Sequence, residues 1–293
     1  MTQGTEGREK GFADSRFGDN RFDGVTLPSG LTIRYAERGP AGAVPVVFLH
    51  GYTDSWNSFR LVLDALSEQR HAFAPDQRGH GDSEKPERGY DVEGLAKDAL
   101  GFLDALGIER ATIVGHSLGS FIAQSLAISH PERVERLVLI GSAAAIKGHS
   151  GLGEFLAAVS EWPAAPDRAS IREFQEGTVH APIPEWFLEA VIAESAKVPL
   201  HVWRSALAGL LDADLTDRLA AIRLPVWIVW GERDALFTHS DQEALVASIP
   251  GARLSVYPDV GHAPHWERPR EFVRDLERFL DGEILESVAS HAG

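Results

Sequence analysis

Short apolar runs alternate with amphipathic segments along most of the chain. The apolar runs are rich in β-branched and aromatic residues, as expected of strands that are buried on both faces. They cover residues 44–49, 71–75, 111–114, 134–140, 224–230 and 253–257. Apolar residues at helical spacing follow these runs at residues 58–67, 92–106, 121–129, 241–248 and 269–280. The alternation predicts an α/β fold, with a mostly parallel sheet covered by helices on both faces.

The two ends of the chain differ from this pattern. Residues 21–26 and 31–37 alternate between polar and apolar positions and flank the turn Pro28-Ser29-Gly30, which predicts an antiparallel hairpin. Residues 1–20 are polar, charged and rich in glycine, so we expect a flexible N-terminal segment. The tail from residue 282 is expected to be frayed.

The alternation also stops between residues 143 and 215. This segment has no convincing strand and carries several prolines between helical stretches. It also contains six large aromatic residues: Phe155, Trp162, Phe174, Trp186, Phe187 and Trp203. We predict three or four helices inserted as a cap, with residues 21–142 and 216–293 forming the core.

Composition and charge exclude several classes of function. The formal net charge of −15 argues against nucleic acid or an anionic membrane as a partner. The chain has no cysteine, which excludes disulfides, thiolate metal sites and a cysteine nucleophile. No apolar run approaches the roughly 20 residues of a membrane span, and no signal-peptide core is present near the start. We therefore expect a cytoplasmic protein; the sequence does not indicate an oligomeric state.

The strongest chemical signal is Gly115-His116-Ser117-Leu118-Gly119, between a predicted strand and a predicted helix. The pattern Gly-x-Ser-x-Gly in this context is typical of a nucleophile elbow. A serine at such a turn has a strained backbone, so the residues two before and two after it need to be small. We therefore interpret Ser117 as a nucleophile, exposed at the start of a helix whose N-terminal N–H groups can stabilise an oxyanion.

A serine hydroxyl needs a base, normally histidine, to remove its proton. His262 follows the last predicted strand, where the carboxyl ends of parallel strands gather functional groups. Three other histidines, His50, His80 and His116, also lie in loops at this edge. His262 is preferred because it completes the chain order serine, acid, histidine of the α/β-hydrolase triad.

An acid must orient that histidine and stabilise its protonated form. Asp234 lies in a turn just after the predicted strand 224–230, with Glu232 as the near rival. The oxyanion needs two donors, for which we expect the backbone N–H groups of Leu118 and Tyr52. Asp241 and Asp259 are interpreted as solvated residues at a helix start and in a loop.

Five segments of the chain together resemble the α/β-hydrolase superfamily, in its single-cap, esterase-like branch. They are His50-Gly51-Tyr52, Asp76-Gln77-Arg78-Gly79-His80-Gly81-Asp82-Ser83, the segment Gly115–Gly119, Gly231-Glu232-Arg233-Asp234, and Gly261-His262-Ala263-Pro264-His265-Trp266-Glu267-Arg268-Pro269. The resemblance implies an eight-stranded core with a helical lid, and Ser117, Asp234 and His262 as the catalytic triad. Epoxide hydrolases and haloalkane dehalogenases are similar in these loops but carry aspartate at the position of Ser117, which makes both activities unexpected.

The leading hypothesis is a serine hydrolase that cleaves carboxylic esters of small to medium apolar substrates through an acyl-enzyme, without cofactor or metal. His262 and His265 are too close in the chain to suggest metal ligation without partners. Three alternatives use the same triad: lactone hydrolysis, cofactor-free perhydrolysis, and hydrolysis of carbon–carbon bonds in ring-cleavage products. The last tends to need a basic residue near the pocket, for which the cap offers Arg168, Arg172, Lys197 and Arg204. An alternative of another class is a hydrolase-like protein that binds a small molecule.

Overall fold

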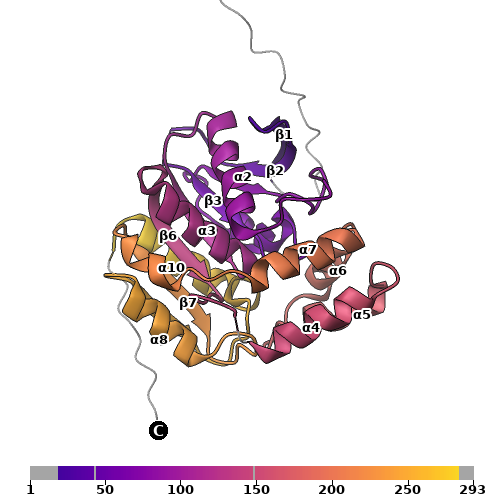
Figure 1. The fold of residues 1–293 in the computed structure, drawn as a ribbon. Helices are drawn as coiled ribbons and strands as arrows, with labels where there is room; N and C mark the ends of the chain where they lie inside the picture. The colour runs from indigo at the N-terminus through magenta and orange to yellow at the C-terminus, as the bar shows by residue number, and fades with distance from the viewer. Residues whose placement is uncertain (1–18, 43, 148, 284–293) are drawn as a thin grey trace, which may run out of the picture.

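One sheet of eight strands runs through the molecule (Figure 1), with the strand order β1-β2-β4-β3-β5-β6-β7-β8. The computed structural model describes residues 19–42, 44–147 and 149–283 of the 293-residue chain. The strands are β1 (Arg21–Thr26), β2 (Thr32–Arg38), β3 (Val46–Leu49), β4 (Ala72–Pro75), β5 (Ala111–His116), β6 (Val134–Ile140), β7 (Val226–Gly231) and β8 (Arg253–Tyr257). The pairs β1–β2 and β2–β4 are antiparallel, and all other neighbours in the sheet are parallel. The predicted mostly parallel α/β sheet is confirmed.

Helices pack on both faces of the sheet because alternate side chains of each buried strand point to opposite faces. In β3, Val47 and Leu49 belong to a hydrophobic core shared with α2 (Val92–Ala105), α3 (Leu118–Ser129) and α8 (His239–Ser248). Val46 and Phe48 belong to a second core, on the other face. That core is shared with α1 (Arg60–Ala65) and α10 (Pro269–Leu280), which explains why β3 is apolar at every position.

The segment between β6 and β7 leaves the sheet and forms four helices. They are α4 (Ser150–Glu161), α5 (Arg168–Glu176), α6 (Glu185–Ser195) and α7 (Leu200–Leu211). In Figure 1 they group to one side of the core. We refer to residues 143–215 as the cap.

Two local differences from the sequence prediction have clear causes. Asn20 is not part of a loose segment: it is buried, and its side-chain amide donates to Asp64 at 3.2 Å. Residues 1–18 and 284–293, predicted as flexible or frayed, lie outside the described residues. The helix predicted at residues 58–67 begins with the 3₁₀ turn η2 (Trp56–Phe59), which Ser55 caps through its side chain, before α1 starts.

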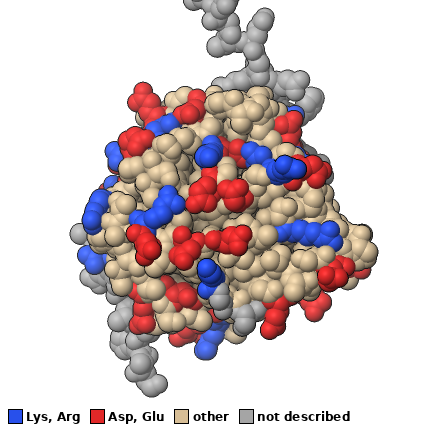
Figure 2. Space-filling view, in the orientation of Figure 1, with Lys and Arg blue, Asp and Glu red and all other residues tan. Residues whose placement is uncertain are grey.

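The outer surface carries both signs of charge. On the face shown in Figure 2, acidic and basic side chains are interspersed, although acidic residues outnumber basic ones in the whole chain. Within the described residues, no helix combines the length and the apolar character needed to cross a bilayer.

Candidate functional site

Ser117 lies at the junction of β5 and α3, in a conformation that few residues adopt. Its backbone has φ 50° and ψ −119°, and it precedes the first residue of α3. A Cβ atom on Gly115 would lie 2.3 Å from the carbonyl oxygen of Gly119, and one on Gly119 would lie 2.0 Å from that of Leu49. Both glycines are therefore required by contact with backbone, and the tight turn presents Ser117 at the carboxyl edge of the sheet.

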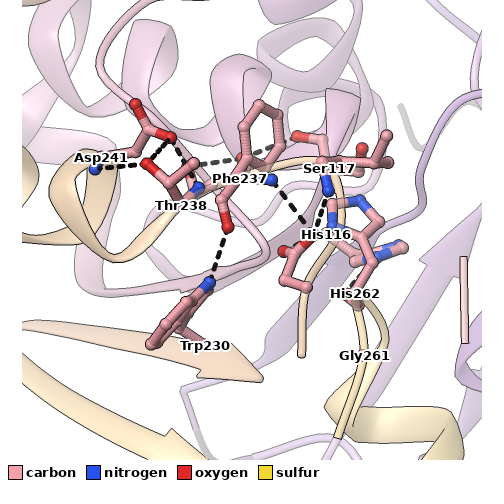
Figure 3. A network of polar contacts seen from close by, with 12 residues as sticks. His116, Ser117, Trp230, Phe237, Thr238, Asp241, Gly261 and His262 are labelled. Carbon is pink, nitrogen blue, oxygen red and sulfur yellow. Dashed lines mark hydrogen bonds and ion pairs between the residues drawn. The ribbon is translucent and has the colours of Figure 1, made fainter. Parts of the chain in front are cut away.

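His262 lies in the loop after β8, at the same edge. Its ring centroid is 4.9 Å from that of His116 and 5.4 Å from that of Phe237. Figure 3 shows His116, Ser117 and His262 close together. The Nδ1 atom of His262 is 2.8 Å from Oδ2 of Asp234. Nε2 is buried and has no hydrogen-bond partner among the described residues, so it is free to exchange a proton with a substrate or nucleophile.

The Asp234 carboxylate is held by its own turn. Oδ1 accepts hydrogen bonds from the N–H groups of Leu236 at 2.8 Å and Phe237 at 3.1 Å, which leaves Oδ2 for His262. The Asp234 side chain is wholly buried. Its rival Glu232 is exposed and lies 3.9 Å from Arg233, so the structure brings Asp234, not Glu232, to the histidine.

The other histidines at this edge have structural partners. His50 is fixed through both ring nitrogens, by the Gly51 carbonyl and the Gln77 N–H. His80 contacts the carbonyl of Arg78, and His116 donates from Nε2 to the carbonyl of His262 at 3.2 Å. Burial lowers the pKa of His50 and His116 well below the ordinary value, so these rings stay neutral and buttress the site.

The two expected oxyanion donors lie beside Ser117. Leu118 is the first residue of α3, and Tyr52 lies in the loop after β3 and lines the same cavity as Ser117. In the described part of the chain, neither backbone N–H donates a hydrogen bond to another residue. Both are thus free to bind a developing negative charge.

A cavity of about 970 Å³ opens over Ser117 and His262, between the core and the cap. Four of the six cap aromatics line it: Phe155, Trp162, Phe174 and Trp203. The other two do not, since Trp186 is half exposed and Phe187 packs against Trp266. The cavity therefore has a largely apolar, aromatic wall, as is usual in pockets for small molecules.

Three buried polar residues near the site were not predicted from the sequence: Asp54, Gln175 and Glu267. Glu267 lies inside the Gly261–Pro269 segment that resembles the superfamily, and this location could have indicated a role for Glu267 near the site. Asp54 and Gln175 are far apart in the chain and meet only in the folded protein, where Gln175 Nε2 donates to Asp54 Oδ1 at 3.3 Å.

The Glu267 carboxylate ties the cap to the loop that carries His262. It accepts backbone hydrogen bonds from Gly261 at 2.9 Å, His180 at 3.0 Å and Ala181 at 2.5 Å. The N–H of His262 also donates to the carbonyl of Thr178 at 2.9 Å. The cap segment 178–181 and the His262 loop are thus held together by one buried acid and one backbone hydrogen bond.

Replacing Glu267 with alanine is expected to lower the free energy of unfolding by about 3 kcal/mol, because three N–H groups, two of them buried, lose their acceptor. Denaturant unfolding followed by circular dichroism measures this change. Glu132→Ala removes an exposed acid and should stay within about 0.5 kcal/mol of wild type. Equal unfolding midpoints for Glu267→Ala and Glu132→Ala would show that the buried bonds contribute nothing.

No metal-binding cluster is found in the part of the chain that the structure describes: no group of three or more His, Cys, Asp or Glu side chains is placed to hold an ion.

Comparisons with known proteins identify the family to which this fold belongs. The chain is 32% identical over 254 residues to 2-hydroxymuconate semialdehyde hydrolase from a Pseudomonas species, covering 80% of this chain and 86% of that protein. It is similar to the solved structure of Est816, described as an N-acyl homoserine lactone degrading enzyme, with 33% identity, a TM-score of 0.74, and coverage of 87% of this chain and 99% of that one. An esterase from Exiguobacterium antarcticum, 23% identical, shares the fold with a TM-score of 0.79, covering 88% of this chain and 98% of that one. The α/β hydrolase fold family matches residues 44–269, and the chain belongs to this family.

Proposed function

We propose that this hydrolase cleaves uncharged carboxylic esters through an acyl-enzyme, with Ser117, His262 and Asp234 as its triad. The observation that carries the proposal is the placement of His262. Asp234 contacts Nδ1 of His262, Nε2 of His262 has no partner among the described residues, and His262 lines the same largely apolar cavity as Ser117. This is the arrangement in which an imidazole can activate a serine hydroxyl.

The residues suggest a two-step reaction. Ser117 attacks the ester carbonyl while His262 takes its proton, and the N–H groups of Tyr52 and Leu118 stabilise the oxyanion. His262 returns the proton to the departing alcohol. It then activates a water molecule that hydrolyses the acyl-enzyme, which restores Ser117 and releases the acid.

The lining of the cavity favours uncharged substrates over ring-cleavage products, which carry a carboxylate. No Lys or Arg is found among the described residues that line the cavity, whereas Asp54, Glu173 and Asp241 are. The four basic cap residues considered from the sequence are engaged elsewhere. Arg168 and Arg172 pair with Glu189, Lys197 with Asp82 and Glu194, and Arg204 donates to three backbone carbonyls of residues 159–162.

Lactone hydrolysis is the second candidate. A lactone is a cyclic ester and requires no change in the proposed mechanism. The likeness to a lactone-degrading enzyme at 33% identity supports this candidate. Perhydrolysis and binding without turnover remain alternatives, which the experiment below separates from hydrolysis.

The proposal is tested in two stages. Labelling with a fluorophosphonate, followed by mass spectrometry of the peptide, should identify Ser117; no labelled peptide would favour a binding protein.

A substrate panel then compares methyl esters, lactones, a ring-cleavage dienoate, and peracid formation from acetate and peroxide. We expect the uncharged esters or lactones to have the highest kcat/KM. A preference for the dienoate, or for peroxide over water, would overturn the proposal.

A further inference from the structure

Asp54 is a buried acid that the proposed mechanism does not use. Its side chain is 4% exposed, yet it lines the cavity together with Ser117 and His116. It lies two residues after Tyr52, so it adjoins the expected oxyanion site. The intervening residue, Thr53, has φ 62°, a region that β-branched residues rarely adopt. This strained backbone turns the chain just before Asp54.

Asp54 accepts two long hydrogen bonds from side chains, and the backbone N–H of Gly51 also interacts with its carboxyl group. Gln175 donates to Oδ1 and Ser58 to Oδ2, both at 3.3 Å, beyond the usual range for hydrogen bonds to a carboxylate. The nearest ring nitrogen is Nδ1 of His116, at 3.9 Å from Oδ2. Burial raises the pKa of Asp54 to about 7, which fits a carboxyl group with no basic side chain bonded to it.

His116 supplies a second unused acceptor at the same place. Its Nε2 donates to the carbonyl of His262, so the neutral ring carries its lone pair on Nδ1. That nitrogen is buried and has no hydrogen-bond partner among the described residues. A Cβ on Gly51 would lie 2.9 Å from it and 3.1 Å from Asp54 Oδ2, so both acceptors pack closely against the backbone of Gly51.

We infer that the carboxyl group of Asp54 forms a subsite that accepts a hydrogen bond from an N–H group next to the scissile carbonyl of the substrate. The chemical class is an N-acylated α-amino ester or lactone. The position beside the oxyanion donors assigns the N–H to the carbon that bears the reacting carbonyl. This inference rests on the proposed ester hydrolysis and specifies its substrate.

The test compares two methyl esters of equal size. Methyl N-acetylglycinate and methyl 4-oxopentanoate differ only in N–H against CH₂ next to the reacting end. Each kcat/KM is divided by the hydroxide-catalysed rate constant of that ester, which removes the difference in intrinsic reactivity. For wild type, we expect the corrected ratio, that of the N-acetyl ester over methyl 4-oxopentanoate, to be at least about ten, the effect of about one hydrogen bond.

In Asp54→Leu, the corrected ratio should fall close to one, while kcat for methyl 4-oxopentanoate stays within a few fold of wild type. If this variant does not fold, as judged by its thermal unfolding, Asp54→Ala replaces it. Glu173→Leu, at an exposed acid that also lines the cavity, is the matched control and should keep the wild-type ratio.

Two outcomes would overturn the subsite. One is a wild-type ratio near one; the other is a ratio that both Asp54 variants retain. Failure of the proposed ester hydrolysis would look different from failure of the subsite, because wild type would then hydrolyse neither ester.

Discussion

Replacing Ser117 with alanine is expected to lower kcat/KM for an uncharged ester by about 10⁴- to 10⁶-fold, because the acyl-enzyme can no longer form. The oxyanion donors and the cavity would remain, and they account for the small rate that we expect to persist. Rapid mixing with p-nitrophenyl acetate should show a burst of p-nitrophenol in wild type if deacylation is the slower step, and none in Ser117→Ala.

Ser129→Ala is the control for this variant. Ser129 is exposed at the end of the same helix, α3, and its loss should leave kcat/KM within about twofold of wild type. Ser117→Ala should also unfold close to wild type, since the elbow is fixed by Gly115 and Gly119. Substantial activity in a folded Ser117→Ala protein would contradict covalent catalysis by this residue.

The second large effect is expected at Asp234. Asparagine would keep the size of the side chain and could still accept from Leu236 and Phe237 through its oxygen. Its amide would then face Nδ1 of His262, which favours the wrong tautomer, and kcat should fall by about 10⁴-fold. Steady-state kinetics on an uncharged ester measure this loss.

Glu232→Gln provides the matched comparison in the same turn. Glu232 is exposed and does not contact His262, so its variant should keep nearly all activity. If Asp234→Asn kept its rate while Glu232→Gln lost it, the assignment of the acid would be reversed.

Most of the core could be predicted because its strands and helices depend on local patterns. The bounds of β6, β8 and α10 match the predicted ranges, since each apolar run there coincides with one element. The elbow was predictable for the same reason: a short motif, a strand and a helix lie next to one another in the chain. The helix predicted at residues 121–129 begins three residues too late. In the structure, α3 starts at Leu118, directly after the strained Ser117.

The lining of the cavity could not be predicted in this way. Whether Trp186 or Trp203 faces the cavity depends on how the cap helices pack, and both lie in similar helical sequence. The basic residues of the cap illustrate the same limit. Arg172 was a candidate for the pocket, but its ion pairs with Glu185 and Glu189 hold it on the cap surface. Such contacts join residues from different helices, and no local pattern encodes them.

The bonds of Glu267 set a condition for engineering this enzyme. A chimaera that takes its cap from another hydrolase must keep main-chain donors and an acceptor at residues 178–181, because these groups anchor the loop of His262. Junctions placed after residue 181 would preserve this anchor, whereas a complete exchange of residues 143–215 would require the graft to rebuild it.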